Sequence, residues 1–141
     1  RGIKPEWEVF SPTHILQDTT TLIQEGHDDE PYFINLVMNV HRNFQNAMPY
    51  SPRFLQMMVD TLPKGSIFCV SGIGPSQLEA NVAALLLGGH ARVGFENNLL
   101  AKDGHTAPDN AALVRQAVVS AQALGRPLAT ADDIRQRFTP G

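Results

Sequence analysis

The chain has 141 residues, of which 43% are hydrophobic and 18% charged, and its formal net charge is −3. This length suits one compact domain, and the negative charge argues against a surface for nucleic acids. The longest apolar run covers residues 82–87, well short of the roughly 18 residues that a membrane span needs. We therefore expect a single domain that binds neither nucleic acid nor membrane.

The only cysteine in the chain is Cys69. An internal disulfide is therefore excluded, and we expect a small core residue in the reducing cytoplasm. The sequence opens on Arg1 and shows no signal peptide. We interpret it as a cytoplasmic segment of a longer polypeptide.

Predicted strands and helices alternate from one end of the chain to the other. The predicted strands cover residues 3–10, 32–39, 66–73 and 90–96. Each is followed by a predicted helix: the first covers 13–25, the second begins at Pro52, the third covers 77–87 and the fourth covers 110–124. A last short helix follows, where Thr130 and Asp133 have the spacing of a capping box. The strand starts are roughly 25 to 35 residues apart, the size of a βα unit, so the alternation predicts a parallel sheet covered by helices.

The charge pattern of the predicted strands distinguishes between two architectures. Alternate side chains of a strand share a face, which places Lys4, Glu6 and Glu8 together in the first strand, and Arg92 and Glu96 together in the fourth. A doubly wound sheet is apolar on both faces, whereas a barrel with a ligand site at its C-terminal end accommodates charge on the inner one. We therefore predict an α/β fold of the (β/α)₈ TIM-barrel type. A whole barrel needs about 250 residues, so residues 1–141 would form half of a single barrel domain.

The position of each charge along its strand suggests its role. Lys4 and Glu6 lie near a strand start and would neutralise one another in an ion-pair network, whereas Glu8, Arg92 and Glu96 lie nearer the strand ends, where barrel chemistry takes place. We expect the acidic run at 28–30 to be a solvated loop. For His41, just after a strand, a substrate contact and a surface position are both open.

Five segments of the chain occur in the order and spacing of one known family. They are GIKPEWEVF at 2–10, PYFINLV at 31–37, SGIG at 71–74, GGHARVGFE at 88–96 and NAALV at 110–114. In these segments the chain resembles the β-keto acid cleavage enzymes, a family of zinc-dependent (β/α)₈ barrels. The matched region is the C-terminal half of the family barrel, strands five to eight with the terminal helices.

The resemblance implies a reaction between a 3-keto acid and acetyl-CoA, which gives acetoacetate and a new acyl-CoA. It also implies a homo-oligomer and a Zn²⁺ ion held by a His-x-His motif and by a glutamate on the eighth strand. Glu96 matches that glutamate, but the chain has no His-x-His motif. We expect the N-terminal half of the barrel to supply it.

The resemblance further assigns catalytic positions. Arg92 matches the family's arginine on the last strand, and Glu8 matches its glutamate on the fifth. Asn97 stands where the family has an acidic residue proposed as the proton-transfer base. Because an amide cannot act as a carboxylate base, Glu8 or a group outside the chain would take that role. The segment VHR at 40–42 also departs from the family's Gly-rich turn, which suggests a different substrate side chain.

The turn after the third predicted strand is a candidate binding site for anions. Ser71, Gly72 and Gly74 could present backbone N–H groups to a substrate carboxylate or to the phosphates of CoA. A plain tight turn explains the same residues equally well.

Two other functions are compatible with the pattern. One is a metal-free barrel isomerase or aldolase that binds phosphate through Arg92 and the glycine turn. The other is a non-catalytic half-barrel that serves as an assembly module. Measuring the metal content would separate both functions from the zinc enzyme.

Whichever function is correct, four βα units leave open edges at the first and fourth strands. We therefore expect the segment to need its other half or a second copy for stability.

Overall fold

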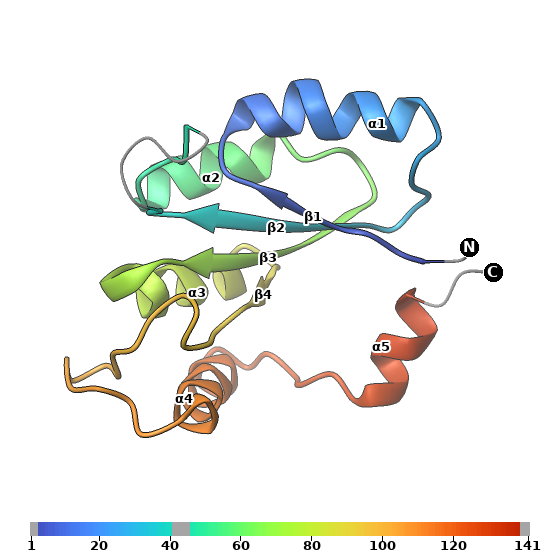
Figure 1. Ribbon diagram of the computed structural model, residues 1–141. Coiled ribbons are helices and arrows are strands. Elements are labelled where there is room, and N and C mark those ends of the chain that lie inside the picture. The colour runs from blue at the N-terminus through green and yellow to red at the C-terminus, as the bar shows by residue number, and fades with distance from the viewer. Residues whose placement is uncertain (1–2, 41–45, 139–141) are drawn as a thin grey trace.

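A parallel sheet organises the chain, and its strands lie side by side in sequence order (Figure 1). The computed structural model describes residues 3–40 and 46–138. The strands are β1 (Glu6–Val9), β2 (Tyr32–Met38), β3 (Ser66–Gly72) and β4 (His90–Ala91), and each adjacent pair is parallel. The predicted α/β fold with a parallel sheet is confirmed. A doubly wound sheet reverses its strand order at one point, and this order, β1-β2-β3-β4, contains no reversal.

Side-chain caps mark the starts of some of the helices. A π-helical segment (His14–Thr19) leads into α1 (Thr20–Gln24), and a 3₁₀ turn (Gly74–Ser76) leads into α3 (Gln77–Leu86); the others are α2 (Pro52–Asp60), α4 (Asn110–Ala123) and α5 (Ala131–Phe138). At α2, Oγ of Ser51 accepts a hydrogen bond from the backbone N–H of Phe54 (3.2 Å). The predicted capping box is confirmed, because Thr130 N donates to Asp133 (2.7 Å) and Asp133 N donates to Thr130 Oγ1 (3.2 Å).

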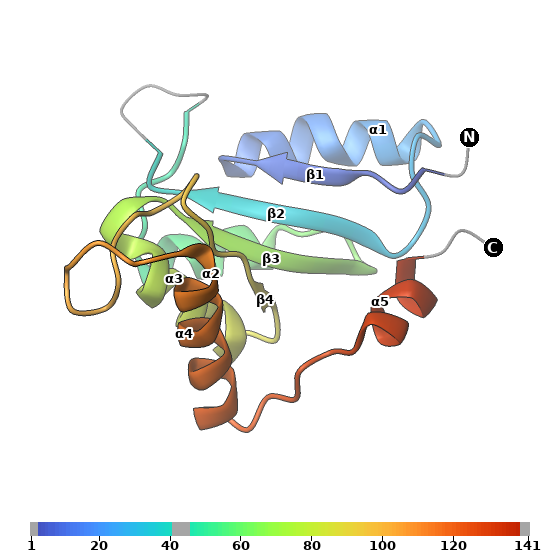
Figure 2. The ribbon, with the colours of Figure 1, turned by 60° about the horizontal axis from the view of Figure 1, so that its bottom comes forward.

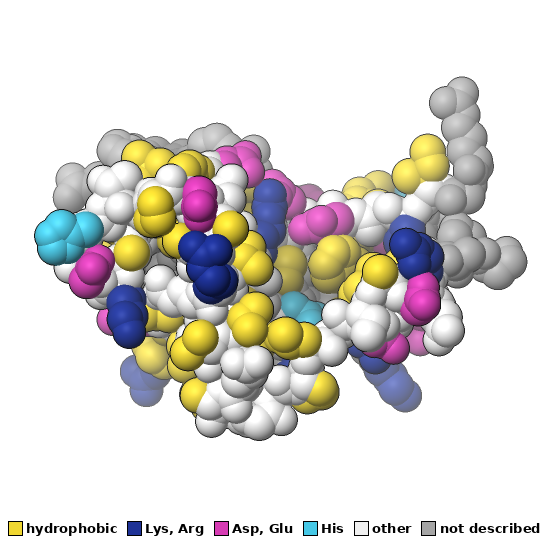
Figure 3. Space-filling view, turned by 90° about the horizontal axis from the view of Figure 1, so that it is seen from below, with side chains coloured by type: hydrophobic (Ala, Val, Ile, Leu, Met, Phe, Trp, Pro, Cys, Tyr) yellow, Lys and Arg dark blue, Asp and Glu magenta, His cyan; other side chains and the backbone are white. Residues whose placement is uncertain are grey.

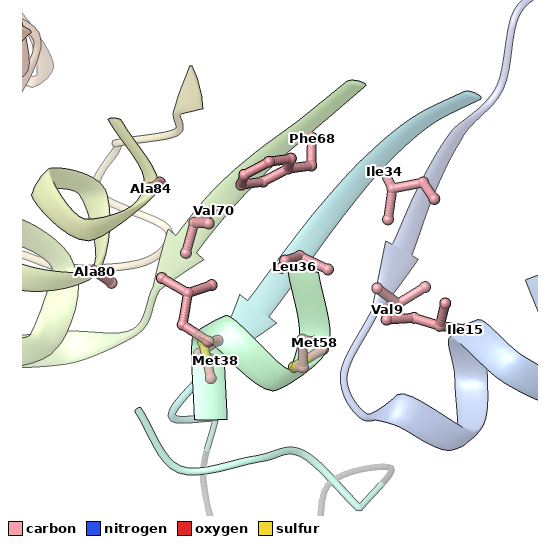
Figure 4. Close-up of a cluster of buried hydrophobic side chains, with 11 residues drawn as sticks. Val9, Ile15, Ile34, Leu36, Met38, Met58, Phe68, Val70, Ala80 and Ala84 are labelled. Carbon is pink, nitrogen blue, oxygen red and sulfur yellow. The ribbon is translucent and has the colours of Figure 1, made fainter. Parts of the chain in front are cut away.

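The hydrophobic core lies between the helices and one face of the sheet (Figure 4). Its buried members from the strands are Val9, Ile34, Leu36, Met38, Phe68 and Val70, and its members from the helices are Ile15, Leu55, Met58, Ala80 and Ala84. Helices that follow successive parallel strands of unreversed order pack on the same side, because each crossover is right-handed. The structure therefore has one apolar, helix-covered face, and the opposite face of the sheet is left for polar side chains.

Gly72 lets α3 approach the sheet closely. A Cβ atom at this position would lie 2.8 Å from Cβ of Ala80 and 2.9 Å from Cα of Gln77. Both neighbours belong to α3, and neither contact is one that a flexible side-chain end could relieve. The absent side chain at Gly72 thus sets the distance between β3 and its helix.

Arg126 connects the end of α3 to the chain beyond α4. Its guanidinium donates to the backbone carbonyls of Leu85 (2.9 Å), Gly89 (3.1 Å) and Gly88 (3.3 Å). These carbonyls lie at the C-terminal end of α3, where a cation is favoured. From there the chain runs to α5, which lies by the starts of β1 and β2 (Figure 2), with the rings of Phe33 and Phe138 5.0 Å apart.

The predicted extent of the fourth strand is wrong. The fourth strand ends at Ala91 rather than at residue 96, although Arg92 N continues the ladder by one bond to Val70 O (3.1 Å). Residues 95–97 form a turn, closed by a hydrogen bond from Asn97 N to Gly94 O (3.0 Å). Glu96 therefore lies in that turn and not on a strand.

The acidic run at 28–30 is also not simply solvated. Asp28 is buried and accepts hydrogen bonds from Lys4 Nζ (2.6 Å) and Trp7 Nε1 (2.8 Å). Lys4 thus pairs with Asp28 and not with Glu6. In the segment VHR at 40–42, His41 and Arg42 lie outside the described residues. Among the helices of the described ranges, none is both long and apolar enough to cross a membrane.

We expect the substitution Gly72→Ala to lower the free energy of unfolding by about 1–3 kcal/mol, because the added methyl group overpacks the β3–α3 contact. Gly94→Ala is the matched control, since its Cβ would lie 3.8 Å from the nearest atom, Oδ1 of Asn110. Urea unfolding of both variants in the complete protein gives the comparison. Equal unfolding midpoints for the two variants would show that α3 is free to move away from the sheet.

Candidate functional site

Polar side chains line up across the face of the sheet opposite the apolar core. The strand register places Glu8 beside Asn35, Asn35 beside Cys69, and Cys69 beside His90. Directly paired residues of neighbouring strands point to the same side of a sheet. One row of four polar or ionisable side chains therefore crosses the whole width of the sheet.

An ion pair joins the two outer strands over this row. Nη1 of Arg92, one residue past β4, lies 2.5 Å from Oε1 of Glu8 on β1, and its Nη2 lies 3.4 Å from Oε2 of Glu96. The first and fourth strands of a sheet are about 14 Å apart, so both side chains must lean along the sheet to meet over the two central strands. The contact brings the charges of the outer strands together above the polar row.

The charge of Arg92 is stabilised by its neighbours. Burial disfavours the guanidinium charge, but the hydrogen bond and the charge of Glu8, with smaller effects from Glu6 and Glu96, outweigh it and raise the pKa of Arg92. A guanidinium that stays charged and is held between two carboxylates is well suited to bind an anionic substrate or to stabilise a developing oxyanion. The predicted proximity of Glu8, Arg92 and Glu96 is thus present in the structure.

Asn35 is a polar residue of the site that was not predicted. Its side chain is 0% exposed, and Nδ2 donates to Oε1 of Glu8 (3.2 Å). Its Oδ1 accepts from Oγ of Ser71 (2.9 Å) and from Sγ of Cys69 (3.4 Å). The signal available in the sequence is that Asn35 is the one amide in the otherwise apolar run FINLVM at 33–38. Such a residue on a buried strand needs hydrogen-bond partners.

The turn that was predicted to bind anions makes hydrogen bonds and packing contacts within the protein. Ser71 and Gly72 belong to β3, where Ser71 is buried against Asn35 and Gly72 faces α3. The backbone N–H of Gly74, whose φ is +66°, donates to the carbonyl of Asn97 (2.8 Å). A contact of this turn with a substrate carboxylate or with CoA phosphates stays a prediction.

The hydrogen bond between Gly74 and Asn97 connects the turns that follow β3 and β4. Beside these turns lies a cavity of about 200 Å³, lined by residues that include Gln77 and Lys102. Gln77 is buried, and its Oε1 accepts from the N–H of Gly94 (3.4 Å). The cavity also touches α3 through Leu78 and Glu79 and α4 through Gln116, and neither Glu8, Asn35 nor Arg92 lines it.

The two other ionisable groups of the polar row are uncharged at neutral pH. Burial, with the positive charges of Arg126 and Arg137, lowers the pKa of His90. Burial is also the main cause that raises the pKa of the Cys69 thiol to about 12, and the carboxylates Glu6 and Glu8 add to it. Cys69 therefore acts in this site as a hydrogen-bond donor and not as a nucleophile.

The described part of the chain offers one candidate ligand for a metal and no complete site. No group of three or more His, Cys, Asp or Glu side chains in residues 3–40 and 46–138 is placed to hold an ion. The side chain of Glu96 is 82% exposed and makes only the long contact with Arg92, so its carboxylate is available for a cation. Further ligands would have to come from residues outside this set.

Hydrophobic side chains are exposed over α4, on the face of the molecule that Figure 3 shows. Val114 and Val119 are among them. Leu113 and Ala121 are the buried residues of this helix, which packs against α3. Much of the apolar surface of α4 is thus left without cover by the described residues.

Known proteins match the chain over almost all of its length. Residues 1–139 match the family model described as beta-keto acid cleavage enzyme. A 3-keto-5-aminohexanoate cleavage enzyme of Acetoanaerobium sticklandii is 36% identical over 135 residues, which are 96% of this chain and 48% of that protein. A 3-oxoadipate:acetyl-CoA acetyltransferase of Cupriavidus necator is 37% identical over 137 residues, 95% of this chain and 46% of that protein. The chain spans about half the length of these curated relatives.

A solved structure shares the fold. The apo structure of ObcA matches with a TM-score of 0.71 at 20% sequence identity, over 97% of this chain and 36% of that one. At this identity the similarity concerns the fold alone.

We expect Cys69 to resist thiol reagents in the folded protein, because at pH 8 a thiol of pKa about 12 is ionised in only about one molecule in ten thousand. Labelling with iodoacetamide at pH 8 should be at least about 100-fold slower than in the urea-unfolded protein. The unfolded sample is the control for intrinsic reactivity. Rapid labelling of the native protein would mean that the polar row opens to solvent.

Proposed function

The chain belongs to the beta-keto acid cleavage enzyme family, and we propose that it forms half of a (β/α)₈ barrel in a zinc-dependent enzyme of that kind. The reaction transfers the acyl group of a 3-keto acid to CoA and the acetyl group of acetyl-CoA to the acid's remaining carbons. Its products are acetoacetate and a new acyl-CoA. The observation that carries the proposal is Arg92, held between Glu8 and Glu96 at the carboxyl end of the sheet.

Three features support the half-barrel. The strand order has no reversal, the core helices pack on one face, and the charges of the outer strands, Glu8 and Arg92, meet on the opposite face. The outer edges of β1 and β4 are unpaired in the described sheet, and such edges are normally covered or paired. Further strands of a longer chain, which the length of the relatives suggests, would pair with both edges, enclose the polar face and cover α4.

Arg92 has the chemistry to handle the negative charge of the reaction. A guanidinium binds a carboxylate with two parallel hydrogen bonds, and the same donors stabilise an oxyanion that forms on a carbonyl oxygen. Glu8 holds one arm of this fork through Nη1. Arg92 would thus bind the 3-keto acid or stabilise the oxyanion of carbon–carbon bond formation.

The proton-transfer role falls on Glu8 or on a group outside the chain. Asn97 has an amide where the family has an acid, and an amide does not accept a proton at neutral pH. Oε1 of Glu8 accepts hydrogen bonds from Asn35 and Arg92, while Oε2 has no hydrogen-bond partner among the described residues. That second oxygen is free to exchange a proton with a substrate carbon.

Glu96 fits one position of a zinc site. Its exposed carboxylate lies beside Arg92, and oxygen is a regular ligand of zinc. A His-x-His motif from the other half of the barrel would complete the set. When bound, zinc would act as a Lewis acid on the ketone oxygen of the 3-keto acid, next to the guanidinium that this chain provides.

The substitution Arg92→Lys should lower the rate of acetoacetate formation on the order of 10²-fold, because lysine keeps the charge but loses the planar fork. The measurement uses the complete protein with acetyl-CoA and a panel of 3-keto acids, with bound zinc checked to be unchanged. Arg115→Lys is the matched control, since this exposed arginine pairs only with Asp109 (3.7 Å) away from the polar row. Near-normal turnover of Arg92→Lys would make Arg92 a structural ion-pair residue.

The substitution Glu96→Gln should weaken zinc binding by about 10- to 100-fold and lower activity with it, because an amide is a poorer ligand than a carboxylate. Elemental analysis of the purified complete protein after dialysis gives the zinc content. Glu25→Gln, at an exposed position after α1, controls for the loss of one negative charge. Full zinc occupancy of Glu96→Gln would remove Glu96 from the ligand set, and a wild-type protein without zinc would favour a metal-free function.

A further inference from the structure

The buried amide of Asn35 makes three hydrogen bonds on the polar face of the sheet. It lies at the centre of the sheet, between Glu8 on β1 and Cys69 on β3. Nδ2 contacts Glu8, and Oδ1 contacts both Ser71 and Cys69. A buried amide costs stability unless it is hydrogen-bonded, so the contacts hold the side chain in one place.

The partners of Asn35 also decide which way the amide faces. A hydroxyl and a thiol can each donate or accept, so Ser71 and Cys69 alone would allow either orientation of the amide. The carboxylate of Glu8, in its ion pair with Arg92, offers only acceptors. The NH₂ group must therefore face Glu8, which turns Oδ1 to the donors Ser71 and Cys69 on β3.

As a consequence, a single carboxylate oxygen of Glu8 accepts both of its side-chain hydrogen bonds. Oε1 accepts from Nδ2 of Asn35 (3.2 Å) and from Nη1 of Arg92. Two donors on one oxygen fix the rotation of the carboxylate. Oε2 is left as the oxygen that a ligand can use.

We propose that Asn35 is a positioning residue for the reaction: it holds Oε1 of Glu8 against Arg92 and leaves Oε2 of Glu8 for the substrate. This inference rests on the proposed function, because it gives Glu8 and Arg92 a substrate to act on. Asn35 itself touches neither substrate nor metal in this scheme. It acts through Glu8, from the strand next to it.

Several charged or titratable groups face Glu8 besides Asn35. They are Glu6 on the same strand, Cys69 on β3, His90 on β4, and Arg92 and Glu96 after β4. Asn35 is the neutral side chain that donates a hydrogen bond to Glu8. An aspartate in its place would keep the size but bring a second carboxylate next to Glu8, and two adjacent carboxylates do not both ionise readily.

The test is the pH dependence of kcat/KM for acetoacetate formation by the complete protein carrying Asn35→Asp. We expect the acid limb of the profile to move to higher pH by about one unit or more, because the pKa of the coupled carboxylates rises. Val37→Thr, two residues along on the same face of β2 and also buried, should leave the limb in place. A uniform loss of rate at every pH in Asn35→Asp would overturn the inference, since a merely structural role gives that result.

Asn35→Ala covers the case in which the aspartate variant does not fold. It removes one donor from Glu8 without adding charge, so the acid limb should move in the same direction by a smaller amount. A folded Asn35→Ala protein with the wild-type limb would overturn the inference.

A measurement without substrate separates this inference from the proposed function. The titration of the Glu8 carboxyl is followed by NMR with isotope-labelled glutamate, and its signal is assigned by its absence in Glu8→Gln. A raised pKa of Glu8 in the Asn35 variants supports the coupling, and an unchanged value overturns it. If the wild-type protein turns over no 3-keto acid, the proposed function fails while this titration still decides the role of Asn35.

Discussion

The contact between Glu8 and Arg92 constrains the sheet as a whole. It links the first strand to the residue that follows the last one, across the two strands between them. The pair fixes the charged side chains of the outer strands over Asn35 and Cys69, on the face opposite the apolar core. The assembly of the charge site therefore depends on this one ion pair.

The central strands support this pair in two different ways. On the helix side they supply large apolar residues, including Ile34, Leu36 and Val70. On the other side they supply Asn35 and Ser71, both buried and hydrogen-bonded to each other. A polar network in a sheet is stable only when its members are satisfied. The outer strand β1 completes that condition, because Nδ2 of Asn35 donates to Glu8.

Much of this arrangement follows from the sequence, and the exceptions have physical causes. Alternation along the strands predicted that Glu8 and Arg92 share a face, because the period of a strand is fixed at two residues. The end of β4 was not predictable in the same way, since a turn closed by Asn97 and Gly94 overrides the pattern of a strand. The role of Asp28 depends on Lys4 and Trp7, more than twenty residues earlier in the chain, which no local pattern reports. Asn35 required both neighbouring strands before its partners could be known.

The distance along the chain between Glu8 and Arg92, 84 residues, has a consequence for folding. Each strand pairs with its neighbour in sequence, so the sheet can grow one βα unit at a time during synthesis, with only modest loops to close at each step. The ion pair closes a much longer loop and requires all four strands to be in place. It is therefore expected to form last. A partly folded chain would contain a core and helices but no assembled charge site, so the chemistry becomes available only when the sheet is complete.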